Sequence, residues 1–319
     1  MTSSHKLILI TLFSLVIALS APWVGLNDIA DDILKQQILL DIRVPRVLFA
    51  FVAGAGLSLC GMVFQAMFHN PLATPFTLGV ASGASFGAAC TVFLGINVSL
   101  FGFDIITIGA FIGALVAITF VFFISQLQRG FSSETLLLTG VATSFFFSSL
   151  ILFIQYLSDM TDSFMIMRWL MGGLTSASYQ SLLQLIPVVT VSTAIILWLS
   201  RELNLLMAGD DIALSRGVSV RQVRYLLFFS TSLCVGGIVA LSGPIGFIGM
   251  MVPHICRLII GTDHRWLTPA TIMFGGGFLI LCDGIARLLI APAEIPVGII
   301  TTLLGGPFFL WLLIKRRQG

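Results

Sequence analysis

Ten long apolar segments follow one another along the chain, separated by short polar connections. They cover roughly residues 6–24, 46–67, 78–95, 104–126, 133–157, 180–200, 222–242, 244–260, 267–287 and 296–314. A helix needs about 20 mostly apolar residues to cross the hydrocarbon core of a bilayer. Because lipid offers no hydrogen bonds to the backbone, such segments must be helical. The pattern predicts an all-α polytopic membrane protein with about ten transmembrane helices, forming a single transmembrane domain over residues 1–319.

Two of these segments are unusual. The first contains Ala18-Leu-Ser-Ala21, which is similar to a signal-peptide cleavage site, but the apolar run continues to Leu26. We therefore expect a retained first helix. The eighth segment is short, contains Pro253 and follows the turn residues Ser242-Gly243-Pro244, so it is either a full span or a re-entrant piece.

The composition excludes several function classes. Only 9% of the residues are charged and 57% are hydrophobic, whereas an ordinary soluble domain carries about 25% charged residues. A soluble enzyme, a nucleic-acid binder and a secreted disulfide domain are thereby excluded. The five cysteines lie singly in apolar runs, and the histidines are scattered, so no metal or cofactor site is expected in this chain. None of the three lysines follows a glycine, so the phosphate-binding loop of ATPases is absent.

The positions of the cations predict the orientation in the membrane. With the amino terminus inside and ten spans, eleven of the 16 lysines and arginines fall on the inner side. These are Lys6, Arg129, Arg201, Arg216, Arg221, Arg224, Arg257, Arg265, Lys315, Arg316 and Arg317. Cytoplasmic loops carry an excess of Lys and Arg. Both termini are therefore expected in the cytoplasm.

Glycines recur at helical spacing in two neighbouring segments. Gly79, Gly83 and Gly87 lie four residues apart, as do Gly109 and Gly113. Small residues at this period allow helices to approach closely in lipid. The pattern predicts tight helix packing without indicating a particular function.

Two clusters of charge stand at the expected outer side. Arg43 and Arg46, three residues apart, would share one face at the start of the second helix, where they either snorkel or accept carboxylates of an external partner. Asp283 and Arg287, four apart, can form an ion pair within one helix. Arg287 lies nearest the outer face and would join the first cluster.

The most polar stretch on the inner side runs from Ala208 to Arg224. It is interpreted as two short helices broken at Gly217, with Asp210 and Asp211 near the first amino terminus, where anions are favoured. A solvated loop is the alternative. Ile212 and Leu214 would gain nothing in water, which favours a docking element for a cytoplasmic protein. Two inner connections, residues 68–72 and 131–134, are either turns or parts of a gate.

These residues resemble the BtuC/FecCD-type permease family of binding-protein-dependent ABC importers, which take up iron–siderophore complexes, haem or cobalamin. The resemblance rests on Arg43-Val-Pro-Arg46, Asn70-Pro-Leu-Ala73, Leu78-Gly-Val80, Gly209 to Val220, Gly243-Pro-Ile-Gly-Phe-Ile-Gly249, Val252-Pro-His254, Asp283 to Leu288 and Glu294 to Gly298. It implies a homodimer or heterodimer of ten-helix, BtuC-like subunits in the bacterial inner membrane.

The resemblance also assigns roles to residues. Two cytoplasmic ATP-binding subunits, which carry ATP and magnesium, would dock against a coupling loop at about 203–224. Its members are Gly209, Asp210, Asp211, Ala213, Leu214, Gly217 and Val218. A periplasmic substrate-binding protein would dock through glutamates onto Arg43, Arg46 and Arg287. The cytoplasmic gate would comprise Asn70, Leu72, Ser133 and Glu134. The chain departs from the family pattern at Asp210, where Glu is more usual, and at Glu134, which replaces a small polar residue.

The function expected from the resemblance is import of an iron–siderophore complex, driven by ATP hydrolysis on a separate subunit, so this chain itself is not an enzyme. Haem and cobalamin are alternative cargoes. A secondary transporter driven by an ion gradient is an alternative of another class, but such proteins use ionisable groups within the membrane. Asp283 is the clearest such group here, and Arg287 can pair with it.

Overall fold

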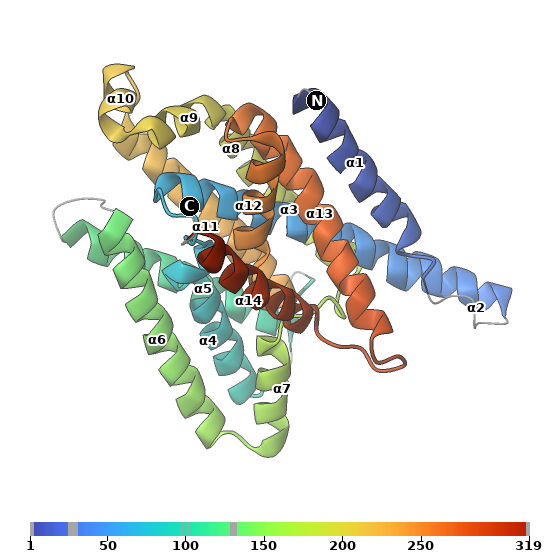
Figure 1. The fold of residues 1–319 in the computed structure, drawn as a ribbon. Coiled ribbons are helices and arrows are strands. Elements are labelled where there is room, and N and C mark those ends of the chain that lie inside the picture. Colours follow the sequence, from blue (N-terminus) through green and yellow to red (C-terminus); the bar gives the residue numbers. More distant parts are fainter. Residues whose placement is uncertain (1–2, 25–30, 97, 101, 128–132, 317–319) are drawn as a thin grey trace.

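The computed structural model is a bundle of helices (Figure 1). It describes residues 3–24, 31–96, 98–100, 102–127 and 133–316. The first half contains α1 (Ser3–Ser20), α2 (Asp32–Gln37), the π-helix η1 (Ile38–Arg43), α3 (Val44–Met67), the 3₁₀ helix η2 (Pro75–Leu78), α4 (Val80–Phe93), β1 (Ser99–Leu100), β2 (Phe103–Asp104), α5 (Ile105–Leu127) and α6 (Ser133–Leu157). The second half contains α7 (Met160–Leu170), α8 (Tyr179–Trp198), α9 (Ser200–Ala208), α10 (Asp210–Ser215), α11 (Val220–Ser242), α12 (Ile248–Ile260), α13 (His264–Leu288) and α14 (Val297–Arg316).

The long apolar helices match the predicted polytopic fold. Among the described residues, seven helical stretches are long and apolar enough to cross a membrane: α1, residues 32–67, α5, α6, α8, α11 and α13. Three shorter apolar helices, α4, α12 and α14, lie at the other predicted segments. The all-α membrane fold is thus confirmed, while the number of complete spans and the cytoplasmic placement of both termini stay predictions.

The second span begins earlier than the sequence suggests. Asp31 caps α2, since its carboxylate accepts hydrogen bonds from the Ile33 and Leu34 amides, and the helix then continues through η1 into α3. The expectation that Arg43 and Arg46 stand at the start of a helix is therefore wrong. A proline within a helix removes one backbone donor, and the wider π turns of η1 precede Pro45 here. α3 is then buried along almost its whole length.

Glycines allow α4 and α5 to pack at backbone distance, as predicted. Gly83 and Gly87 of α4 lie against the backbone of Gly113 and Gly109 of α5, and none of these positions has room for a Cβ atom. Gly79 serves a different purpose. It precedes α4 with φ +78° and packs against α6 at Thr143. The small-residue stripe therefore holds one helix pair, and its first glycine forms a turn.

The eighth apolar segment forms only a short helix. α12 begins at Ile248, after an extended stretch in which Gly243 and Phe247 both have positive φ. Its 13 residues rise about 20 Å, less than the hydrocarbon thickness. Gly249 packs directly on the backbone of Gly61 in α3, which holds this short helix against the buried centre of the bundle.

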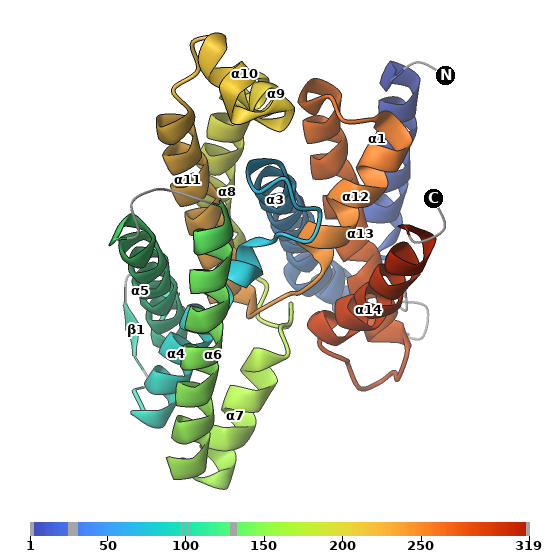
Figure 2. The same cartoon turned by 60° about the vertical axis from the view of Figure 1, so that its left-hand side comes forward.

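The two ends of the bundle carry different elements. α9, α10 and the first turn of α1 lie at one end, and α2, α7 and the connection between α13 and α14 lie at the other (Figures 1 and 2). The predicted helix break at Gly217 is present between α10 and α11, but a second break at Gly209 was not predicted and the helix after Gly217 is not short. The two short helices are α9 and α10, and they meet at Gly209 with φ +120°. Gly217 ends the turn after α10, and the helix that follows is the long α11.

Candidate functional site

Four charged side chains form one network at the end of the bundle that is predicted to face outward and is called the outer end below. Arg46 donates from Nε and Nη2 to Oδ1 of Asp283, at 3.0 and 2.8 Å, and from Nη1 to Oε2 of Glu294, at 2.8 Å. The Nε of Arg287 lies 3.2 Å from Oδ2 of Asp283 but lacks hydrogen-bond geometry, so this contact is an ion pair only. The network joins α3, α13 and the segment leading to α14. The predicted pair between Asp283 and Arg287 is present.

Burial divides this network into an inner and an outer part. Asp283 is 1% exposed and Arg46 is 7% exposed, so their pair is shielded from water. The Glu294 side chain is 39% exposed. Removing a buried charge from its partner is costly, whereas a solvent-exposed ion pair contributes little. Arg46 therefore has one permanent partner, Asp283, and one accessible partner, Glu294.

The third predicted docking cation, Arg43, completes this cluster. It donates to the backbone carbonyls of Pro22 and Val24, while Nη2 of Arg287 donates to the carbonyl of Ala21 at 3.3 Å. All three arginines and Glu294 line one cavity of about 340 Å³. The structure thus brings the three predicted residues together, with Arg46 buried and with Arg43 and Arg287 partly exposed. Their role in docking stays a prediction.

At the opposite end, α10 exposes apolar side chains. Ile212 is 48% and Leu214 is 58% exposed, whereas Ala213 between them is fully buried. α10 is anchored to α11 because Arg224 donates to Asp210 at 2.8 Å. The turn at Gly217 is closed by the Val218 amide, which donates to the carbonyl of Ala213 at 3.0 Å. Asp211 is exposed in the first turn of α10. The segment therefore presents a fixed, partly apolar surface, the arrangement expected of a docking element.

Three contacts that sequence reasoning missed hold α9 in place. The Asn204 amide donates to Asp263 at 3.0 Å, and the Asn204 carbonyl oxygen accepts from the His264 backbone amide at 3.0 Å. The ring of His69 lies 2.8 Å from the carbonyl of Leu206. The backbone amide of Arg265, and next the Asn204 side chain, hold the pKa of Asp263 below its ordinary value. The one available signal was Asp263 as a helix N-cap.

The predicted gate residues lie on two elements that pack together. Asn70 accepts from the Leu72 amide at 2.9 Å, which forms a turn after α3, and Leu72 is exposed. This turn leads into η2, whose backbone lies against Gly140 of α6. Ser133 and Glu134 begin α6, but their side chains lie outside the described residues, as does Arg129. The gate assignment stays a prediction.

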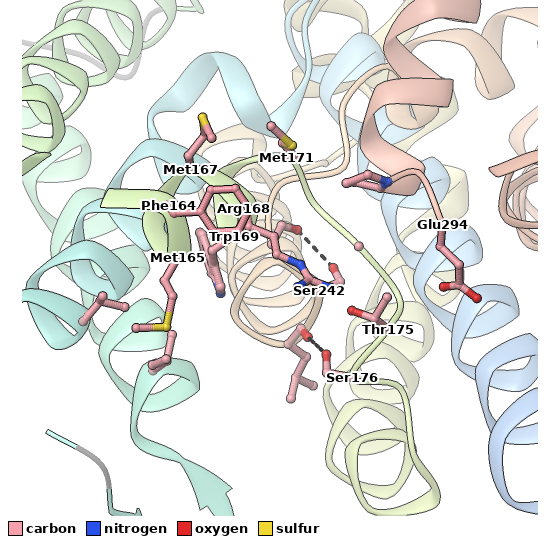
Figure 3. Close-up of a pocket in the computed structure, with 16 residues that line it drawn as sticks. Phe164, Met165, Met167, Arg168, Trp169, Met171, Thr175, Ser176, Ser242 and Glu294 are labelled. Carbon is pink, nitrogen blue, oxygen red and sulfur yellow. Dashed lines mark hydrogen bonds between the residues drawn. The ribbon is translucent and has the colours of Figure 1, made fainter. Parts of the chain in front are cut away.

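A large cavity opens between α7, the end of α11 and the segment before α14 (Figure 3). Its volume is about 540 Å³. The walls are mostly apolar or weakly polar and include Phe164, Met165, Met167, Trp169, Met171, Thr175 and Ser176. Its charged lining residues among those described are Arg168 and Glu294. Glu294 thus borders both this cavity and the arginine cluster.

We compared this chain with known proteins. The model of the FecCD transport family matches residues 7–315. The chain belongs to this family. It is therefore an ABC importer permease and a multi-span protein of the cytoplasmic membrane.

Relatives of this FecCD permease cover most of its length. The hemin transport system permease protein HmuU of Yersinia pestis is 40% identical over 88% of this chain and 84% of its own length. The vitamin B12 import system permease protein BtuC of Klebsiella pneumoniae is 41% identical over the same shares. A solved structure described as an inward-facing conformation of a metal-chelate type ABC transporter is 34% identical, with a TM-score of 0.89, and covers 98% of this chain and 99% of its own. The expected BtuC-like fold is confirmed.

Proposed function

We propose that this permease moves an iron–siderophore complex from a periplasmic binding protein to the cytoplasm, driven by ATP hydrolysis on a separate subunit. The observation that carries the cargo class is the outer cavity. A volume of about 540 Å³ suits a bulky organic chelate. Most of its lining side chains are apolar, with Arg168 as the cation among those described, so it suits a bulky, weakly polar chelate. A cargo delivered already bound by a carrier needs only such a weakly binding passage.

The ends of the bundle support a division of labour among partners. The exposed Ile212 and Leu214 would dock a cytoplasmic ATP-binding subunit, and ATP with magnesium would bind there and not to this chain. The arginines at the other end would receive carboxylates of the binding protein, because Arg matches carboxylate geometry. A second permease subunit, identical or different, would complete the path. Movement of α9 and α10 would then reach the turn after α3 through His69.

Two relatives named for hemin and vitamin B12 keep haem and cobalamin as candidate cargoes. The three cargoes are distinguished by titrating the binding protein of the same transport system with each ligand and following tryptophan fluorescence. Submicromolar binding of a ferric siderophore, with none of haem or cobalamin, supports the proposal. Preference for either alternative would reassign the cargo while leaving the permease role intact.

The docking role is tested at Arg43. This side chain donates to backbone carbonyls, so Arg43→Glu leaves the buried pair of Arg46 and Asp283 in place. Reversal of Arg46 is a poorer test, because it would place a third carboxylate beside Asp283 and Glu294. We expect Arg43→Glu to weaken binding of the substrate-loaded binding protein at least tenfold in nanodiscs. Unchanged affinity would refute the docking role.

A further inference from the structure

The hydrogen bond that Arg46 makes nearest the surface goes to Glu294, a carboxylate of the same chain. A guanidinium carries five donors in a planar fork. Two of the Arg46 donors are used on Asp283, and Nη1 is used on Glu294. Asp283 is sealed inside the bundle, whereas Glu294 lies at the surface. The donor that faces the outside is therefore already satisfied by a carboxylate that water can reach.

An external carboxylate would need this same position. It would approach through the cavity that Arg43, Arg46 and Arg287 line, and Glu294 stands in its wall. The Nε and Nη2 atoms of Arg46 point to Asp283 and are turned away from such a partner. An incoming carboxylate that binds Nη1 would therefore lie beside Glu294 on the same nitrogen. Two carboxylates at one donor repel each other, so the more weakly held one leaves.

We propose that Glu294 is an internal stand-in for a partner carboxylate, and that docking of the binding protein exchanges one for the other on Arg46. This inference rests on the proposed docking role of the arginines. It names the chemistry of the partner, a surface glutamate or aspartate. It also gives docking a direct consequence within the permease, the release of Glu294.

The released residue belongs to a segment that borders the outer cavity. The amide of the next residue, Ile295, donates to the carbonyl of Ala286 at 3.2 Å, and the amide of Gly298 donates to the carbonyl of Gly172 at 3.1 Å. Gly298 also packs directly on the backbone of Met171, which lines that cavity. Exchange at Arg46 therefore removes the side-chain attachment of the segment before α14 and leaves its backbone bonds to Ala286 and Gly172 as the remaining restraints. Docking would weaken the contact between this segment and the end of α7, at the entrance of the outer cavity, when the loaded binding protein arrives.

The exchange predicts that loss of a charged residue from this site increases the affinity for the binding protein. Neutralising Glu294 removes the competitor, so Glu294→Gln should tighten binding of the substrate-loaded binding protein to the permease in nanodiscs. A partly exposed ion pair is worth a few tenths to 1 kcal/mol, which corresponds to a gain of about two- to fivefold. The gain should shrink at high salt, because exposed charges are screened. Asp41→Asn is the matched control, since it removes one carboxylate from the exposed surface of η1 on the same side.

Hydrogen exchange provides a second measurement that needs no partner. In Glu294→Ala the Ile295 amide should exchange faster than in the wild type, because its segment loses the bond to Arg46. Exchange unchanged at Ile295 would contradict the restraint that the proposal assigns to Glu294.

The outcomes separate this inference from the docking role. Tighter binding by Glu294→Gln, with Asp41→Asn unchanged, supports the exchange. Equal tightening by both variants would assign the effect to net charge and refute it. Weaker or unchanged binding by Glu294→Gln, with Arg43→Glu still weakening binding, refutes the exchange and leaves docking intact. If Arg43→Glu binds normally, docking on the cluster fails and the exchange fails with it.

Discussion

Replacing Asp283 by asparagine should be among the most destabilising conservative changes at the outer end of the bundle. The carboxylate faces two guanidinium groups, at 2.8 Å from Arg46 and 3.2 Å from Arg287, and it is 1% exposed. At an effective dielectric of about 20, each such ion pair is worth on the order of 5 kcal/mol before desolvation. Asp283→Asn leaves both cations beside a neutral amide, with Glu294 as the remaining partner of Arg46.

The net cost is smaller than the gross Coulomb energy. Removing one partner of a buried pair typically costs about 3–5 kcal/mol. The asparagine oxygen keeps one hydrogen-bond acceptor and Glu294 still neutralises Arg46, so we expect about 3 kcal/mol. Arg287→Gln should cost only about 1 kcal/mol, because Asp283 keeps both bonds to Arg46 and its ion pair with Arg287 includes no hydrogen bond.

Reversible unfolding in bilayers, followed by steric trapping, measures these free energies. Asp41→Asn, an exposed carboxylate on the same side, should stay within about 0.5 kcal/mol of the wild type. An Asp283→Asn variant within about 1 kcal/mol of the wild type, or one less destabilised than Arg287→Gln, would refute the reasoning.

Three further predictions concern the inner end. Ile212→Asp combined with Leu214→Asp should weaken binding of the ATP-binding subunit more than tenfold in a pull-down, whereas Ser215→Asp on the same short helix should not; equal binding by all would contradict docking on α10. Asp263→Ala removes a helix cap and should lower stability by about 1 kcal/mol, with Asp263→Asn largely restoring it. The folded pKa of Asp263 lies below its ordinary value of 3.8. The stabilisation that its negative charge provides is therefore present above pH 3.8 and disappears as the pH falls through the folded pKa. The difference in thermal midpoint between the wild type and Asp263→Ala should shrink accordingly, and a difference that stays constant down to about pH 3 would argue against this. His69→Ala removes the hydrogen bond to α9 and should lower transport per ATP hydrolysed while the ATP-binding subunit still binds; an unchanged ratio would exclude His69 as a link.

The fold class could be predicted because the length of an apolar run is visible in the sequence without knowledge of tertiary contacts. Every predicted apolar segment contains a helix, and the glycine spacing correctly indicated the packing of α4 on α5. Helix starts were less predictable. The apolar run placed the start of the second span at about residue 46, whereas Asp31 caps it several turns earlier, and such a cap depends on a side chain folding back onto the backbone. Gly209 and Gly217 both have positive φ and both interrupt helices, but only the break at Gly217 was predicted, since the contacts that hold α9 are tertiary.

The sequence indicated which arginines belong to the candidate site, but it did not indicate most of the contacts that they make. Spacing alone gave the pair of Asp283 and Arg287, which lie one helical turn apart. The partnership of Arg46 with Asp283 and Glu294 joins residues separated by 237 and 248 positions, so no local pattern indicates it. The contact of His69 with Leu206 was unpredictable for another reason. Its partner is a backbone carbonyl, which every residue has, so the residue type at position 206 does not indicate the contact.

Uptake into proteoliposomes tests the central claim most directly. The permease is reconstituted with its ATP-binding subunit inside and the binding protein, loaded with a radiolabelled ferric siderophore, outside. We expect accumulation that requires enclosed ATP and the binding protein, and that stops when the ATP-binding subunit is omitted. Accumulation driven by an ion gradient in liposomes that contain this chain alone would contradict it.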